Sequence, residues 1–123
     1  MVKGLGTVIY PVHDLSRAKA WYAAAFQQKP YFDEPFYVGF NIAGYELGLH
    51  PEQSSDQPRP GGGLAYWRVD DITRAIEHFV GTGATLSAPA QDVGEGIKVA
   101  AVSDPFGNRI GLIENPHFKL AKE

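Results

Sequence analysis

The 123-residue sequence contains no cysteine, a single methionine and no apolar run long enough to cross a membrane. The absence of cysteine excludes disulfide bonds, cysteine-ligated zinc and a thiol nucleophile. The N-terminal residues Met-Val-Lys-Gly-Leu-Gly lack the apolar core of a signal peptide, so we expect a cytoplasmic protein without a membrane partner. The net charge of −3 provides no basic footprint, and we expect no nucleic-acid partner.

The sequence instead contains an internal repeat. Residues 14–18 (DLSRA) and 71–75 (DITRA) match type by type, and each segment begins with an aspartate that can cap a helix. Apolar residues follow each aspartate at helical spacing, which predicts two amphipathic helices. Lys29-Pro30 ends the first helix, and Gly81 and Gly83 end the second.

Strand patterns surround both predicted helices. Ala43-Gly44 joins two apolar runs as a hairpin, in which Asn41 faces Glu46, Gly39 faces Gly48 and Tyr37 faces His50. The remaining strands are predicted at residues 5–12, 64–69, 85–93 (interrupted by Pro89), 97–103 and 109–114. A segment rich in glycine, proline and serine separates the halves, which predicts modules at 1–52 and 63–118 with a linker at 53–62.

The order of elements, the doubled helix start and Asp-Pro-Phe-Gly-Asn at residues 104–108 resemble the vicinal oxygen chelate superfamily. This superfamily groups glyoxalase I, bleomycin-resistance proteins and extradiol dioxygenases. The resemblance implies one α+β domain over residues 1–123, in which two βαβββ modules form a curved mixed sheet around a concave cavity, with helices outside. It also implies a homodimer. Because this fold hosts several activities, the resemblance alone does not fix the function.

In metal-dependent members of the superfamily, each module supplies two ligands, which are His, Glu or Gln. The resemblance places these four positions at Thr7, Gly48, Leu64 and Gly111. Glycine and leucine have no donor atom, and a lone threonine hydroxyl is a poor substitute for an imidazole or a carboxylate. We therefore expect no metal cofactor.

Side chains alternate along a strand, so the neighbours two residues from these positions should share their face. The resulting candidates for ligand binding combine aromatic, amide and charged side chains: Tyr37, Asn41, Glu46, His50, Tyr66, Arg68 and Arg109. Ile9, Pro11 and Ile113 share this face, whereas the apolar residues of the opposite face are predicted to pack under the helices. Arginine offers a planar fork for an anion, and tyrosine and histidine offer flat, half-polar surface.

Three functions fit this pattern. The first is a metal-free protein of the bleomycin-resistance type, which would bind a small organic ligand, anionic or aromatic, and could confer antibiotic resistance. The second is an enzyme, either a glyoxalase-like lyase or isomerase or a dioxygenase, with Glu46 or His50 as base or relocated metal ligand. The third is an interaction module whose sheet serves dimerisation. Glu46 could also pair with Arg68 or Arg109 in a purely structural role.

Overall fold

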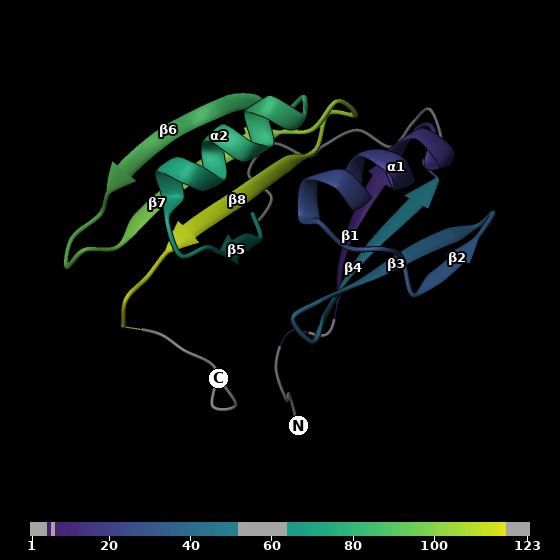
Figure 1. Ribbon diagram of the computed structural model, residues 1–123, viewed down its shortest axis with the longest axis horizontal. Coiled ribbons are helices and arrows are strands. Elements are labelled where there is room, and N and C mark those ends of the chain that lie inside the picture. The colour runs from purple at the N-terminus through teal and green to yellow at the C-terminus, as the bar shows by residue number, and fades with distance from the viewer. Residues whose placement is uncertain (1–4, 6, 52–63, 118–123) are drawn as a thin grey trace. The chain divides into compact units, whose positions relative to one another are not determined.

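The computed structural model describes residues 5, 7–51 and 64–117, which belong to two compact units, Met1–Gly61 and Gly62–Glu123 (Figure 1). The first unit is one helix on a four-stranded sheet, with strand order β1-β4-β3-β2. Strand β1 pairs parallel to β4, whereas β3 pairs antiparallel to both β4 and β2. Its elements are β1 (Thr7–Val12), α1 (Leu15–Phe26), β2 (Phe32–Glu34), β3 (Tyr37–Ile42) and β4 (Tyr45–Pro51).

The second unit repeats this arrangement, with strand order β5-β8-β7-β6 and a parallel β5–β8 pair. The predicted α+β fold of two tandem βαβββ modules is therefore confirmed, and each module has its own four-stranded sheet. The predicted linker, residues 53–62, lies outside the described residues. The elements of the second unit are β5 (Tyr66–Arg68), α2 (Ile72–Thr82), β6 (Thr85–Asp92), β7 (Lys98–Ser103) and β8 (Arg109–Glu114).

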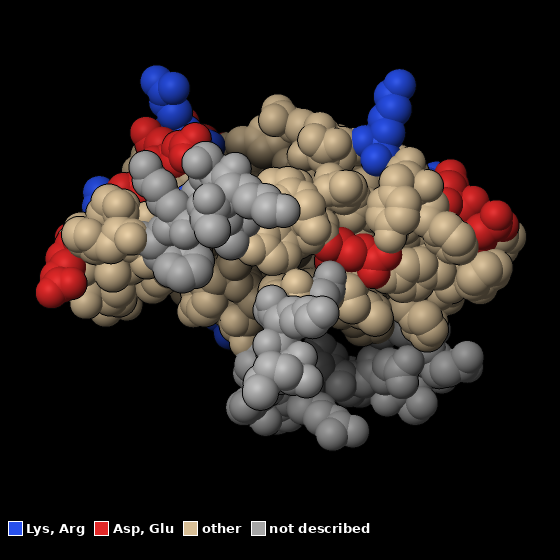
Figure 2. All heavy atoms as spheres, turned by 90° about the horizontal axis from the view of Figure 1, so that it is seen from below, with Lys and Arg blue, Asp and Glu red and all other residues tan. Residues whose placement is uncertain are grey.

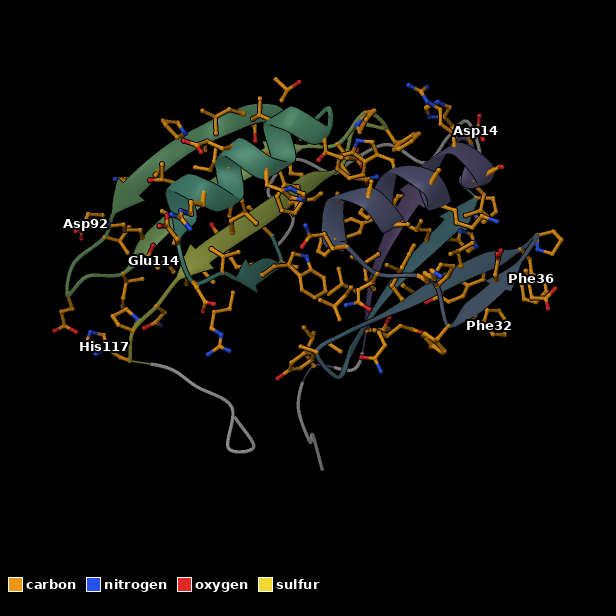
Figure 3. The ribbon with its side chains drawn as sticks, in the orientation of Figure 1. Asp14, Phe32, Phe36, Asp92, Glu114 and His117 are labelled. Carbon is orange, nitrogen blue, oxygen red and sulfur yellow. The ribbon has the colours of Figure 1, made fainter. Side chains whose placement is uncertain are left out.

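Both helices begin where the repeat predicts. The Asp14 carboxylate accepts a hydrogen bond from the backbone N–H of Arg17 at 3.0 Å, and Asp71 accepts one from Arg74 at 3.1 Å. These contacts satisfy backbone donors that have no partner inside a helix. At the start of α2 the Glu114 carboxylate accepts a further bond from the Ile72 backbone N–H at 2.9 Å. Figure 3 shows Asp14 and Glu114 near the first turns of α1 and α2. Neither described helix has the length and apolar character needed to cross a bilayer.

The core of each module lies between its helix and one face of its sheet. Leu47 and Leu49 of β4 and Ile110 and Leu112 of β8 are buried on this face, as the alternation of side chains predicts. In the first module the ring of Tyr22 on α1 stacks against Tyr10 of β1, with centroids 5.8 Å apart. The opposite face of each sheet is left without a helix in its own module. The fully buried side chains include Val12, Tyr22, Val38, Phe40, Leu47, Leu49, Ile72, Val102, Ile110 and Leu112.

Three strands differ most from the sequence expectation. Strand β2 was not placed by periodicity, because its three residues are too few to show a repeat. Strand β1 begins at Thr7 and strand β5 begins at Tyr66, each two residues later than predicted. The predicted irregularity near Pro89 is confirmed, since the β6–β7 register shifts on both sides of Ala88. Proline has no N–H to donate, and a bulge accommodates it.

Candidate functional site

The β3–β4 hairpin builds the centre of the candidate site in the first module. As predicted, Gly39 pairs with Gly48 and Asn41 pairs with Glu46 across the two strands. The turn residues Ala43 and Gly44 have φ angles of 52° and 93°, the left-handed values of a tight hairpin turn. This register places the two glycines and Glu46 on the sheet face that lies opposite the core.

Two phenols hold the Glu46 carboxylate on this face. Tyr31 donates a hydrogen bond to Oε2, and Tyr37 donates one to Oε1 at 2.8 Å. The paired glycines make room for the two rings. A Cβ atom at position 48 would overlap the Tyr37 hydroxyl, and one at position 39 would lie 3.1 Å from Cε1 of Tyr31. Because Gly39 and Gly48 have no side chains, both phenol rings can lie beside the Glu46 carboxylate.

The hydroxyl groups make this site favour the ionised carboxylate. Hydrogen bonds from Tyr31, then Thr7 and Tyr37, lower the pKa of Glu46. Conversely, the hydrogen bond to Glu46 raises the pKa of Tyr31, and burial followed by the bond to Glu46 raises the pKa of Tyr37. Glu46 therefore stabilises the fold above the usual glutamate pKa, and this contribution is lost as pH falls through its lowered pKa. The two phenols stabilise the fold at pH values below the usual tyrosine pKa. This stabilisation is lost as the pH rises through their raised pKa values.

Glu46→Gln should lower the pKa of Tyr31, and to a smaller extent that of Tyr37, toward about 10, because the amide accepts a weaker hydrogen bond and carries no charge, whereas the burial of Tyr37 remains. Ultraviolet titration of phenolate should then show two tyrosines ionising earlier than in the unmodified protein. Asp33→Asn is the matched control, since it makes the same kind of change at a carboxylate that binds the Lys19 ammonium group at 3.0 Å. Superimposable titration curves for the Glu46 variant and the unmodified protein would contradict the described geometry.

Two further candidates, Asn41 and His50, belong to the same β3–β4 hairpin as Glu46. The Asn41 side-chain oxygen accepts a hydrogen bond from the Gly44 backbone N–H at 2.8 Å, so this amide supports the hairpin turn. His50 is exposed at the end of β4. The role of both residues in ligand binding stays a prediction.

The equivalent face of the second module carries an aromatic ring between two arginines. Tyr66 pairs with Gly111, and a Cβ atom at position 111 would lie 2.7 Å from Cδ1 of the Tyr66 ring. Arg68 pairs with Ile113, and Arg109 lies two residues before Gly111 on β8. The two arginines are exposed and share one face, about 13 Å apart along the strand at the usual rise of roughly 3.3 Å per residue. Tyr66 is 48% exposed between them.

The register of both sheets relates two of the four positions at which the superfamily resemblance implies metal ligands. Ile9 pairs with Gly48 and Tyr66 pairs with Gly111, so the two glycines are equivalent in the two modules. A ligating side chain at position 111 would meet the Ala65 backbone carbonyl, and one at position 48 would require the Tyr37 ring to move. Together with Thr7 and Leu64, these residues form a donor set that does not fit a divalent cation. Within residues 7–51 and 64–117, no three His, Cys, Asp or Glu side chains are grouped to hold a metal ion.

Sequence reasoning missed Tyr31. This residue precedes β2, where strand alternation could not assign its direction, and its ring is positioned by the open space over Gly39. The available indication was composition, because aromatic residues recur through the segment Tyr31-Phe32-Asp33-Glu34-Pro35-Phe36-Tyr37. An aromatic-rich segment of this kind is typical of a binding surface.

Two surface features bear on other kinds of site. A hollow of about 500 Å³ lies on the helix side of the first sheet, and its lining includes Leu15, Lys19, Asp33 and Val38. None of the predicted site residues contributes to it. On the face drawn in Figure 2, the acidic and basic side chains of the coloured residues are scattered and form no single basic patch.

Comparison with known proteins identifies the family. The model of the Glyoxalase/Bleomycin resistance protein/Dioxygenase superfamily matches residues 4–112. Among solved structures, a glyoxalase-related enzyme from Fulvimarina pelagi is 22% identical, with a TM-score of 0.79 over 98% of this chain and 94% of that chain. A genomically encoded fosfomycin resistance protein from Listeria monocytogenes is 18% identical, with a TM-score of 0.76 over 95% and 97%.

A lactoylglutathione lyase from Agrobacterium tumefaciens is 19% identical, with a TM-score of 0.74 over 95% of this chain and 98% of that chain. At these identities the structural matches establish the fold and leave the activity open. A comparison with curated protein sequences finds no significant match. The family model covers nearly all of the two βαβββ modules described above. The chain therefore belongs to the Glyoxalase/Bleomycin resistance protein/Dioxygenase superfamily.

Proposed function

We propose that this protein binds a small organic anion without a metal, through the open face of its second module. The observation that carries this proposal is the filling of the superfamily's ligand positions. The Tyr37 and Tyr66 side chains occupy the space next to Gly48 and Gly111, where a metal-dependent member would place donor atoms. These residues therefore support the binding of a small organic ligand better than they support a metal-assisted reaction.

Arg68, Tyr66 and Arg109 indicate the chemistry of the ligand. Two guanidinium groups on one face favour carboxylate or phosphonate oxygens, which they can bind with paired hydrogen bonds. The half-exposed Tyr66 ring between them offers a flat surface on which an aromatic ring can stack. An aromatic acid fits both features.

The principal alternative is a glyoxalase-like enzyme in which Glu46 or His50 acts as base. The contacts of Glu46 argue against it as a base, because both carboxylate oxygens already accept hydrogen bonds and the pKa is lowered. A general base needs the opposite adjustment, toward the working pH. A dimeric assembly and a cytoplasmic location stay predictions from the sequence.

Combined Arg68→Ala and Arg109→Ala substitution should abolish anion binding and leave the fold intact, because both side chains are exposed. A thermal-shift screen with benzoate, fosfomycin and S-lactoylglutathione, followed by calorimetry, provides the measurement. A ligand at a hundredfold excess over Kd should add about 2.7 kcal/mol to the free energy of unfolding.

The matched control is Lys98→Ala, which removes an exposed cation of the same sheet whose strand partner is Glu114. This variant should bind the anion like the unmodified protein. Unchanged affinity in the double arginine variant would refute the proposed site. A stoichiometric divalent cation required for binding in protein purified without chelator would refute the metal-free function.

A further inference from the structure

The first module presents acidic charge on its open sheet face. None of its four strands contains lysine or arginine, and their acidic residues are Asp33, Glu34 and Glu46. Lys19 of α1 binds Asp33 on the helix side. Glu34 pairs with Tyr37 at the end of β2 and also lines the helix-side hollow, so Glu46 is the carboxylate that the open face presents. No strand of this sheet supplies a lysine or an arginine to balance it.

Four aromatic rings from residues 31–37 lie beside this charge, and three of them are exposed. We call Tyr31, Phe32, Phe36 and Tyr37 the aromatic row. The rings of Phe32 and Phe36 meet edge to face with centroids 6.0 Å apart, and Phe32 meets Tyr37 at 6.1 Å. Tyr31 is 62% exposed and Phe36 is 64% exposed. Figure 3 shows Phe32 and Phe36 at the β2–β3 end of the sheet.

The aromatic row and the carboxylate are joined by direct contacts. Tyr31 and Tyr37 both donate hydrogen bonds to Glu46, and Tyr37 also contacts Phe32. A carboxylate has about four lone-pair sites, so the hydroxyl groups leave acceptor capacity for a ligand. The phenols also fix the position of the carboxylate before any ligand arrives, which reduces the entropic cost of binding.

We propose that Glu46 and the aromatic row bind an ammonium group attached to an aromatic ring. Aromatic faces attract cations through the ring quadrupole, and a fixed carboxylate adds direct charge attraction. The exposed rings of Phe32 and Phe36 supply apolar surface for the ligand's own ring. The inference rests on the small-molecule binding proposed above. It adds a ligand class for the first module, whereas Arg68 and Arg109 concern the second.

Three probes of one shape test the role of charge: phenethylammonium, 2-phenylethanol and 3-phenylpropionate. Each is titrated into the full chain, and binding is followed by the amide NMR shifts of β3 and β4. Phenethylammonium should bind at least about tenfold more tightly than the neutral alcohol, since only the ammonium gains the charge attraction. Glu46→Gln should remove that preference and leave the affinity for the alcohol unchanged.

A second variant keeps the test valid if Glu46→Gln does not fold. Phe36→Ala removes an exposed ring and should weaken the binding of both phenethylammonium and the alcohol. Equal affinity for the three probes, no phenethylammonium binding at millimolar concentration, or an unchanged preference in Glu46→Gln would overturn the proposal. Dissociation of a dimer by Phe36→Ala would also overturn it, because a second copy would then cover the aromatic row.

The arginine variants separate this result from the proposed function. Arg68→Ala with Arg109→Ala should leave phenethylammonium binding in place while removing anion binding. Loss of anion binding with phenethylammonium binding retained supports both the proposed function and a separate ammonium site at Glu46. Loss of both ligands in the arginine variant would show that the ammonium site is not confined to the first module, and would refute the inference as stated.

Discussion

Gly111→Ala is expected to destabilise the second module by about 3 kcal/mol, at the upper end of the cost of overpacking. A Cβ atom at this position would lie 2.6 Å from the Ala65 carbonyl oxygen and 2.7 Å from the Tyr66 ring. The carbonyl belongs to the backbone and accepts the Gly111 N–H at 3.0 Å, so relief requires β5 to move away from β8. Urea denaturation measures the change as a lower midpoint with a constant slope.

Two other glycines provide matched controls for this prediction. Gly81 lies within α2 and has nothing within 4 Å of its Cβ position, so Gly81→Ala should stabilise the protein by about 0.5–1 kcal/mol. Gly48→Ala should cost less than Gly111→Ala, because the group it meets is the Tyr37 side chain, which can turn away. That movement breaks the bond from Tyr37 to Glu46. Equal stability of the Gly81 and Gly111 variants would contradict the close approach of β5 and β8.

Asp104→Ala should destabilise the protein by about 3 kcal/mol, because it leaves one buried and two partly buried donors without an acceptor. The Asp104 side chain is 6% exposed and accepts from the backbone N–H groups of Phe106 and Asn108 at 2.8 and 2.7 Å. It also accepts from the Asn108 side-chain amide at 3.0 Å. These bonds fix the turn between β7 and β8. The turn includes Phe106, whose side chain is buried. Urea denaturation again provides the measurement.

The control for this second prediction is Asp92→Ala, at the exposed end of β6 (Figure 3). Asp92 accepts one backbone bond, from Gly94 at 2.8 Å, in a position open to water. Because water replaces a lost partner there, the cost should stay below about 1 kcal/mol. Asp104→Asn should fall between the two alanine variants, since its amide oxygen preserves one acceptor. A cost for Asp104→Ala no greater than that for Asp92→Ala would show that the turn forms without its carboxylate.

The elements that could be predicted from the sequence are those set by neighbouring residues. Asp14 and Asp71 cap their helices through backbone groups three residues away, and Ala43-Gly44 forms its turn through its own φ angles. Alternation along β4 and β8 was likewise sufficient to identify the buried face. Such local chemistry needs no knowledge of the rest of the fold.

What the sequence could not provide depends on residues that are distant along the chain. The ring of Tyr31 lies over Gly39 and reaches Glu46, and no short-range pattern links these three positions. For the same reason the sequence leaves open whether Glu46 pairs with Arg68 or Arg109 or acts as a base, whereas its contacts within the module are hydroxyl groups. Strand β2 was missed because three residues show no period.

The parallel pairing of the first and last strands of each module has a consequence for the order of folding. Strand β1 has β4 as its strand partner among the described residues, so it remains unpaired until residue 45 and beyond have been synthesised. The β3–β4 hairpin closes across a two-residue turn, which costs far less chain entropy than bringing Thr7 to Glu46. We therefore expect each hairpin to form early and each module's leading strand to dock last.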